Sequence, residues 1–378
     1  MGPLQGVRVI EVAGIGPGPF CAMVLADLGA DVVRIDRPPA GGDPDAARYD
    51  ILARGRRSVA VDLKAPGGPD VVLRLAERAD ALLEGFRPGV AERLGIGPDA
   101  CLDRNPRLVY GRMTGWGQDG PLAQTAGHDL TYAAVAGALA HIGRAGQPPT
   151  PPLNLVADFG GGGMLLALGL VAGVLHARAT GQGQVVDSAM VDGTALLMAP
   201  FFGASAMGFW SDERGTNLLD SGAPYYDVYA CGDGEELAVG AIEPQFFAAL
   251  LDVLDLSAQD VPEQNDRTRW PELRAVLAAA ISSRPRAEWL ARSDGTDACM
   301  APVLTMREAA SHPHVRARGT IIERDGVPQP APAPRFSATS TALDRPPSVP
   351  GLHTDEVLLD CDFSEQEIAS LRRAGTIA

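Results

Sequence analysis

Strand-like and helix-like segments alternate over the first 115 residues, and this alternation restricts the fold more than any other feature of the chain. Short apolar runs, rich in β-branched residues, predict strands, and longer runs that follow turns predict helices. The predicted strands lie at 7–13, 30–36, 58–62, 81–84 and 108–113, and the predicted helices at 20–28 and 71–79. Continuously apolar strands are typical of parallel sheets. We therefore expect an open, doubly wound, Rossmann-like α/β domain.

The length of 378 residues exceeds what one hydrophobic core usually serves, so a second domain is expected. Long Ala-, Leu- and Gly-rich runs begin near residue 128, and a pair of strand-like segments followed by helices begins near residue 222. The predicted parts are a large domain at 1–200, a linker at 201–224, a smaller α/β domain at 225–305, an extended, partly Pro-rich return connector at 306–350, and a C-terminal segment at 351–378 that packs on the large domain.

Charge and cysteine usage exclude several kinds of partner. The net charge of −15 disfavours binding to nucleic acid or to an anionic membrane. The longest apolar stretch, 164–177, is shorter than the roughly 20 residues that span a bilayer, and it predicts a buried helix. The five scattered cysteines suit neither a disulfide framework nor a zinc site. Together with an N-terminus that lacks a signal-peptide pattern, they predict mostly buried, reduced thiols and a cytoplasmic protein.

Basic residues gather near the predicted strand ends of this acidic chain. Arg37, Lys64 and Arg87 follow three successive strands, and parallel sheets bind ligands at the carboxyl ends of their strands. Arg54 and Arg57 precede the third strand, and Arg93 follows the fourth, as does Arg87. Such side chains can simply be solvated, but their concentration favours a site for a phosphorylated, nucleotide-like anion.

A glycine cluster follows the first strand, at Gly14, Gly16 and Gly18. It partly matches a dinucleotide-binding fingerprint, and Asp36 stands about 20 residues further on, as that fingerprint requires. The glycine spacing is wrong for the fingerprint, and two prolines stiffen the turn. A tight turn that lets a ligand approach the backbone is the favoured interpretation.

Three further residues are candidates for chemistry, each with a structural alternative. His128, in Gly-His-Asp, needs a partner before it can be called catalytic. Asp158 precedes a Gly-rich run and an apolar helix, where it is either a helix N-cap or an ionised base beside free backbone amides. Glu243 stands at a predicted strand-to-helix turn and can be a plain N-terminal helix acid.

Taken together, these segments resemble the family III coenzyme A-transferases, also called the CaiB/BaiF family, over essentially the whole chain. Within that family the chain is most similar to the α-methylacyl-CoA racemases. The matching stretches are 33–38, 84–89, 112–117, 126–129, 154–162, 183–187, 222–227 and 240–246.

The resemblance implies an isomerase that interconverts (2R)- and (2S)-2-methylacyl-CoA thioesters through an enolate, with no metal or redox cofactor. His128 would take the α-proton from one enantiomer and Asp158 from the other, and Glu243 would orient and charge His128. The amide of Asp158, with the Gly-rich turn, would stabilise the enolate oxygen. The residues that would contact the coenzyme A phosphates are Arg37, Arg54, Arg57, Lys64 and Arg93.

The same resemblance leaves alternatives. Transferases of the family use the aspartate that matches Asp158 as a nucleophile on the acyl group, so acyl-CoA:carboxylate coenzyme A transfer is the second hypothesis. A catalytically silent acyl-CoA-binding protein is the third. His128 and Glu243 favour the racemase. The family further implies an interlocked homodimer, whose active site lies between the large domain of one protomer and the small domain of its partner. The acyl group, whether a branched fatty acid, a steroid side chain or an arylpropionate, is left open.

Overall fold

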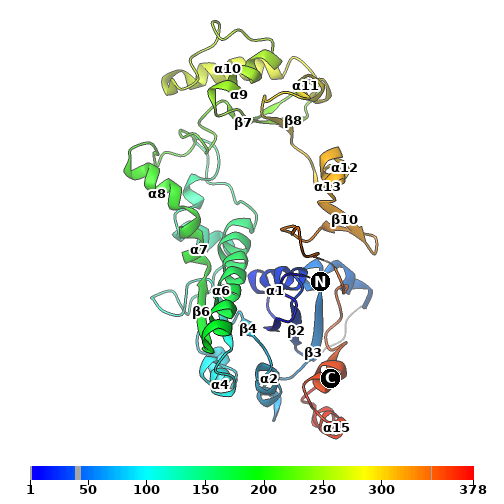
Figure 1. Cartoon of the computed structure of the whole chain (residues 1–378). Coiled ribbons are helices and arrows are strands. Elements are labelled where there is room, and N and C mark those ends of the chain that lie inside the picture. The colour runs from blue at the N-terminus through cyan, green and yellow to red at the C-terminus, as the bar shows by residue number, and fades with distance from the viewer. Residues whose placement is uncertain (1, 39–43, 342) are drawn as a thin grey trace. The chain divides into compact units, whose positions relative to one another are not determined.

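The computed structural model describes residues 2–38, 44–341 and 343–378, which form two compact units (Figure 1). The first unit comprises Met1–Ala136, Pro152–Met198 and Gly319–Ala378, and the second comprises Gly137–Pro151 and Ala199–Arg318. The chain therefore enters each unit more than once. The expected linker at 201–224, the start of the expected connector and residues 137–151 all belong to the second unit.

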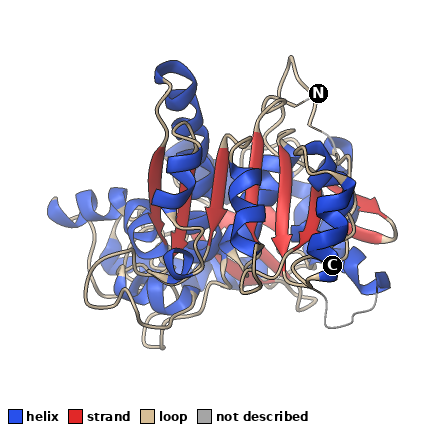
Figure 2. Ribbon diagram, turned by 90° about the horizontal axis from the view of Figure 1, so that it is seen from below, coloured by secondary structure: helices blue, strands red, loops and turns tan. Residues whose placement is uncertain are grey.

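A six-stranded, wholly parallel sheet forms the centre of the first unit, in the order β3-β2-β1-β4-β5-β6. Figure 2 shows its strands side by side, with helices packed across them. The strands are β1 (Arg8–Val12), β2 (Asp31–Asp36), β3 (Arg56–Ala60), β4 (Ala81–Glu84), β5 (Val109–Thr114) and β6 (Gln184–Ala189). The predicted Rossmann-like α/β fold is confirmed.

Helices lie between successive strands of this sheet, and one more follows its last strand. They are α1 (Pro17–Asp27), α2 (Gly68–Ala76), α3 (Val90–Arg93), α4 (Pro98–Arg104), α5 (Asp129–Val135), α6 (Leu165–Thr180) and α7 (Met190–Leu197), with a π-helix at Leu155–Met164 and 3₁₀ turns at Pro44–Tyr49 and Ile51–Ala53. Proline in the first turn of α1, α2 and α4 fixes φ where no intrahelical N–H bond is needed.

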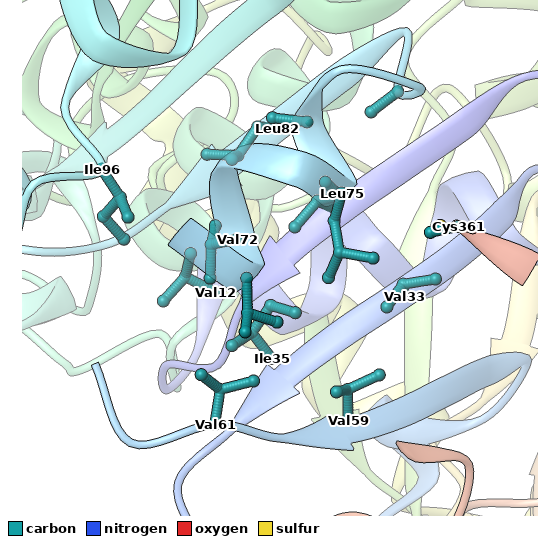
Figure 3. Packing of buried hydrophobic residues seen from close by; sticks show 14 of the residues in the cluster. Val12, Val33, Ile35, Val59, Val61, Val72, Leu75, Leu82, Ile96 and Cys361 are labelled. Atoms are coloured by element: carbon teal, nitrogen blue, oxygen red, sulfur yellow. The ribbon is translucent and has the colours of Figure 1, made fainter. Parts of the chain in front are cut away.

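Alternating strand residues supply the main core of the first unit. Val33 and Ile35 of β2 and Val59 of β3 point to the face covered by α2, where they meet Val72 and Leu75 (Figure 3). Full burial of each such side chain contributes about 1.5–3 kcal/mol to stability. This packing holds the strands in register and so fixes where their carboxyl ends lie.

The C-terminal segment completes the same core. Val357 and Leu358 of α14 (Thr354–Asp360) and Ile368 of α15 (Glu365–Arg373) are buried in the cluster. The main chain of His353 donates to the Ser58 carbonyl on β3 at 2.9 Å. The preceding connector contains an edge hairpin, β10 (Ile321–Arg324) with β11 (Val327–Pro330), rather than extended chain alone.

The third strand begins two residues earlier than the sequence suggested, at 56 instead of 58. Arg56 and Arg57 look like loop residues, but both are buried in the strand. Arg56 pairs with Glu11 of β1, and Arg57 pairs with Asp31 of β2 at 2.7 Å. Buried ion pairs let charged residues occupy strand positions that apolar patterns alone do not reveal.

The apolar helix is longer than the predicted 164–177. The π-helix continues into α6, so that Leu155–Thr180 is one helical stretch of 26 residues, apolar and long enough to cross a bilayer by length and composition. It packs instead against β5 and β6, and a Cβ on Gly173 would stand 2.6 Å from Val109 of β5. The glycines at 160–163 belong to the helix but interrupt the apolar run in the sequence, so the prediction made the helix too short.

The second unit is a smaller α/β assembly, as predicted. Its antiparallel sheet has the order β7-β8-β9 and packs against helices through buried residues such as Leu237, Leu250 and Leu277. The elements are α8 (Ala199–Ala206), β7 (Tyr226–Ala230), β8 (Glu236–Gly240), α9 (Pro244–Val253), α10 (Trp270–Ile281), α11 (Arg286–Ser293), β9 (Met300–Pro302), α12 (Met306–Ser311) and α13 (Pro313–Arg318), with 3₁₀ turns at Leu139–His141 and Arg267–Arg269. The short β9 carried no recognisable pattern in the sequence.

All five cysteines are free thiols, four of them buried and Cys299 exposed. The prediction of mostly buried thiols is confirmed.

Candidate active site

The strand order reverses between β1 and β4, so a crevice opens above the carboxyl ends of these two strands. A cavity of about 330 Å³ lies there. It is lined by residues 14–19 after β1, 85–88 after β4 and 113–116 at the end of β5. His128 and Asp158 line the same cavity. Two of the three expected catalytic residues therefore meet where doubly wound sheets bind ligands.

His128 is the N-cap residue of α5, in extended backbone. The hydroxyl of Thr131 fixes this turn, because it accepts from the His128 amide at 3.0 Å and donates to the His128 carbonyl at 2.8 Å. The imidazole is exposed and has no hydrogen-bond partner among the described residues. Its ring nitrogens are free to exchange a proton with a ligand in the cavity.

Asp158 lies in the first turn of the π-helix, a conformation that recurs at functional sites. Its Oδ2 accepts from Nδ2 of Asn154 at 3.2 Å, and a Cβ on Gly16 would stand 3.3 Å from the same oxygen. Partial burial raises the pKa of Asp158, the Asn154 bond offsets this, Asp129 raises the pKa further, and His128 lowers it. A carboxylate with a raised pKa is a stronger base and, once protonated, a usable proton donor.

Asp129 connects the two candidate catalytic residues. It directly follows His128, and its Oδ1 accepts from the main-chain amides of Ala157 and Asp158, both at 2.7 Å. The side chain is only 4% exposed, and Oδ2 has no hydrogen-bond partner within the described ranges. One buried carboxylate thus ties the start of α5 to the π-helix turn and holds the backbone of Asp158 in place.

This clamp corrects two expectations about Asp158. The helix begins at Leu155, with Asn154 at its N-cap, so Asp158 is not an N-cap residue. Its amide donates to Asp129 and is therefore not available to an enolate oxygen.

The glycines that follow Asp158 serve packing rather than access to a ligand. A Cβ on Gly161 would stand 2.7 Å from the Thr194 amide of α7, and one on Gly163 would stand 2.8 Å from the Pro17 carbonyl of α1. Contacts this close to main-chain atoms exclude any side chain at these positions. The Gly-rich run therefore sets the distance between the π-helix and its two neighbours.

A second cavity, of about 360 Å³, adjoins the first, since Val12 and Phe86 line both. Arg37, after β2, and Lys64, after β3, line the second cavity. Both side chains are exposed, and neither forms an ion pair within the part of the chain that the structure describes. Two unpaired cations beside a cavity suit a phosphorylated ligand.

Two further cations follow β4. Arg87 lines the cavity that contains His128. Arg93 ends α3 and is exposed, outside both sets of lining residues. Neither has an ion-pair partner among the residues described. Four cations after β2, β3 and β4 thus have no ion-pair partner within the described residues.

Arg54 and Arg57 do not lie at this site, contrary to the expectation from the sequence. Arg54 is 2% exposed, donates to both carboxylate oxygens of Asp27 at 3.1 and 2.6 Å, and also donates to Gln329. Arg57 donates twice to Asp31 at the amino end of β2, and to α14. Their guanidinium groups form structural ion pairs at the amino ends of the strands and are not available to a ligand.

Glu243 belongs to the second unit, where it is the N-cap residue of α9, directly before Pro244. Its side chain is exposed and carries no hydrogen bond or ion pair inside the described ranges. Its effect is felt locally by Cys299, whose pKa is raised by burial first and by the Glu243 charge second. The expectation that Glu243 acts on His128 stays a prediction.

Asp36 is not available as the acidic residue of a dinucleotide-binding site. Asp36 accepts from Nε of Arg34 at 2.7 Å and from the hydroxyl of Ser58 at 2.6 Å. The carboxylate is buried and is not free to bind a ribose. Residues 14–19 line the cavity, which agrees with a turn that a ligand can approach.

Several residues of the site were not singled out by the sequence. Tyr132 and Trp116 line the cavity and pack edge to face, with ring centroids 4.8 Å apart. Asn154 holds the Asp158 carboxylate, and Asp129 holds its backbone. The matched stretches 112–117, 126–129 and 154–162 contained Trp116, Asp129 and Asn154 but not Tyr132, and only the folded chain shows which atoms these residues contact.

Comparison with known proteins agrees with this geometry. The family model described as CoA-transferase family III matches residues 4–355. The chain belongs to this family.

Two relatives from mammals span almost the whole chain. The chain is 48% identical to "Alpha-methylacyl-CoA racemase" of Mus musculus over 97% of this chain and 96% of that protein. It is 46% identical to the protein of the same name from Homo sapiens, with the same shares covered. Among solved structures, a CAIB/BAIF family protein from Brucella suis superposes with a TM-score of 0.82, at 25% identity, over 96% of this chain and all (100%) of that one.

Proposed function

We propose that this protein is an α-methylacyl-CoA racemase, an isomerase that interconverts (2R)- and (2S)-2-methylacyl-CoA thioesters. The observation that carries the proposal is that His128 and Asp158 line one cavity at the carboxyl ends of β1 and β4. The near-50% identity to two proteins with this name supports the same conclusion.

The reaction needs one group to remove the C2 proton and another to return a proton to the opposite face. The electron pair of the C2–H bond moves toward the thioester carbonyl and forms an enolate. The protonated form of the other residue then donates to C2 and inverts its configuration. His128 acts as the base for one enantiomer and Asp158 for the other, and the chemistry requires no metal or redox cofactor.

The enolate oxygen needs a hydrogen-bond donor other than the Asp158 amide, which Asp129 already binds. Gly14, Ile15 and Gly16 line the same cavity, and their main-chain amides have no main-chain acceptor among the described residues. Backbone donors held in a stiff turn stabilise developing negative charge without reorganising. We assign the enolate oxygen to this turn.

The coenzyme A portion would extend from the reactive cavity into the second one. Arg37 and Lys64 line that second cavity, Arg87 lines the first, and Arg93 ends α3. Unpaired guanidinium groups bind phosphate oxygens in pairs. This arrangement supports contacts of all four cations with the phosphates. In this proposal Arg87 takes the place of Arg54 and Arg57 among the residues expected to bind the phosphates.

A homodimer is part of the proposal. Leucines along α6 and α7, among them Leu168, Leu175 and Leu196, are more than 60% exposed. Large exposed apolar side chains on one part of a protein are typical of a surface that a partner covers. In an interlocked dimer Glu243 would approach the partner's His128, and its exposed, unpaired carboxylate supports that role.

The proposed location is the cytoplasm. The five free thiols support it, because disulfides are rare in reducing compartments. Fractionation of cells that express the protein, followed by immunodetection against a cytoplasmic marker, tests this part. Recovery in a membrane-enclosed fraction would contradict it.

Coenzyme A transfer is the competing function, because the family includes transferases and Asp158 is a half-exposed carboxylate in the cavity. The test uses 2-methylacyl-CoA thioesters with a branched fatty, a steroid side-chain or an arylpropionyl group, incubated with enzyme in D₂O. Loss of the C2 proton signal in NMR supports the racemase and ranks the acyl groups. Transfer of coenzyme A to an added carboxylate, with an acyl-Asp158 anhydride trapped by hydroxylamine and no loss of that signal, would overturn it.

A further inference from the structure

The loop at residues 85–92 is held by a buried carboxylate that the proposed chemistry does not use. Glu84 is the last residue of β4 and is 1% exposed. Its Oε2 accepts from the main-chain amide of Phe86 at 2.6 Å. The first turn of the loop is therefore fixed by a charge-assisted hydrogen bond, which is stronger than a neutral one.

Arg112 connects the two ends of this loop. It lies opposite Glu84 in the register of β4 and β5, and its Nε stands 3.4 Å from Oε1 of Glu84. Its Nη2 stands 2.9 Å from Oε1 of Glu92, at the far end of the loop on α3. One largely buried guanidinium group thus contacts carboxylates at both ends of the loop.

Residues of this loop line the cavities of the proposed site. Phe86 lines both cavities, and Arg87 lines the one with His128. Arg87 and Arg93, at either side of α3, have no ion-pair partner in the described chain. Glu84 and Glu92 both pair with Arg112. Within the described chain, Arg87 and Arg93 therefore remain available to bind an anion.

A purely stabilising role explains the network poorly. Burial raises the pKa of Glu84 to about 7, with the Phe86 amide and Arg112 offsetting part of that effect. The ionised side chain is therefore costly in the fold, and apolar replacements of buried ion pairs are often neutral or stabilising. The geometric result of the network is the position of the loop.

We propose that Glu84 is a positioning residue that fixes the loop at residues 85–92, so that Arg87 and Arg93 present their guanidinium groups to the phosphates of coenzyme A. The inference rests on the proposed acyl-CoA function and deepens it. Glu84 acts through the Phe86 amide and through Arg112 and Glu92, without touching the substrate.

The test compares two ligands at pH 8: the coenzyme A thioester of a 2-methylacyl group, and the pantetheine thioester of the same acyl group, which lacks the nucleotide. Glu84→Ala is expected to weaken binding of the coenzyme A thioester about tenfold in calorimetry, as for loss of one charge-assisted hydrogen bond, and to leave affinity for the pantetheine thioester unchanged. Glu84→Gln keeps an acceptor for the Phe86 amide and is expected to restore most of the affinity. Equal weakening for both ligands, or a Gln variant as weak as the Ala variant, would overturn the proposal.

Asp80 provides a matched control at the opposite end of the same strand. Its Oδ2 accepts from the main-chain amide of Arg8 at 2.9 Å, and its Oδ1 pairs with Arg178. Asp80→Ala removes a bond of the same kind and should lower stability without changing coenzyme A affinity. A loss of affinity equal to that of Glu84→Ala would show that any weakened strand end has this effect, and would refute the special role of Glu84.

Glu92→Ala keeps the proposal testable if Glu84→Ala does not fold. Glu92 is half-exposed and holds the far end of the loop, so its removal should weaken coenzyme A binding about threefold and spare the pantetheine thioester. Unchanged affinity in this variant would contradict the proposal. Failure of the wild-type protein to bind coenzyme A at all would instead refute the proposed function, so the two failures are distinguishable.

Discussion

Basic residues at the two ends of the parallel sheet differ in burial and in ion pairing. At the amino ends of the strands, Arg54 and Arg57 are buried, and each makes bidentate contacts with an aspartate. At the carboxyl ends, Arg37, Lys64 and Arg87 are exposed and have no ion-pair partner in the described parts of the chain. The same residue types thus stabilise the fold at one end and remain available to a ligand at the other.

The difference depends on which acidic side chains the fold places near each basic residue, and not on the basic residues themselves. Arg54 and Arg57 stand only a few residues from Lys64 in the chain, yet one strand length separates their environments. Asp27 and Asp31, which precede or begin β2, reach the first two and cannot reach the third. The exposed basic residues at the carboxyl ends should therefore affect activity, and the buried Arg54 and Arg57 at the amino ends should affect stability.

The largest effect is expected for the catalytic pair. His128→Ala and Asp158→Asn should each lower the rate of C2 proton exchange about 10²–10⁴-fold. Thermal unfolding should change little, since the His128 side chain is exposed and burial already disfavours the Asp158 charge. His314→Ala, which alters an exposed histidine on α13, is the control and should exchange normally. A wild-type rate in either active-site variant would contradict the assignment.

Arg54→Ala tests the opposite end of the sheet. It leaves Asp27 buried without its partner, which typically costs about 3–5 kcal/mol. Urea denaturation should show that loss, while the molecules that remain folded bind coenzyme A with normal affinity. Unchanged stability together with a lower affinity for coenzyme A would mean that Arg54 contacts the ligand, and would contradict the difference between the two ends of the sheet.

Glu84 should give stability a dependence on pH. Its pKa is about 7 in the folded protein, against an ordinary value of 4.5, so the folded state keeps a proton that the unfolded state has lost between these values. Stability from this group is therefore highest below pH 4.5 and falls by about 3 kcal/mol as pH rises through 7.

Glu84→Gln cannot lose this proton, so its stability relative to the wild type should rise between pH 5 and pH 8. The charged neighbours Arg112 and Glu92, and the nearby Tyr110, stay unchanged in the variant. Denaturant titrations at the two pH values measure the difference directly. Parallel curves for the variant and the wild type would mean that Glu84 is ionised at both.

The smallest effect is expected for a single free cation. Arg37→Ala should raise KM for the acyl-CoA about tenfold and leave kcat unchanged, because one phosphate contact is lost from both ground and transition states. Stability should stay within about 0.5 kcal/mol of the wild type, as for most exposed positions. A large loss of stability would place Arg37 with Arg54 and remove the distinction between the two ends.

The sheet could be predicted because its strands are continuous apolar runs, and the strand ends followed from that. The sequence also identified His128 and Asp158, through the stretches that resemble the family. It could not separate Arg54 and Arg57 from Arg37, because these two arginines bind hydrogen-bond and ion-pair partners, such as Gln329 and Asp360, that lie far away in the chain.

The environment of Asp158 could not be predicted for a similar reason. An aspartate before glycines and an apolar helix has the pattern of an N-cap. Only the fold shows that the helix starts at Leu155 and that the buried carboxylate of Asp129 takes the Asp158 amide. The role of Glu84 was equally hidden, since a glutamate at a strand end gives no sign of the amide it will bind.

The central claim is that His128 and Asp158 move protons on opposite faces of C2. The most direct test incubates a single enantiomer of a 2-methylacyl-CoA with the wild-type protein in D₂O, and follows configuration and isotope together by chiral separation and mass spectrometry. The account predicts an inverted product that carries one deuterium at C2, with the thioester intact. Retained configuration without label, while coenzyme A moves to a free carboxylate, would contradict it.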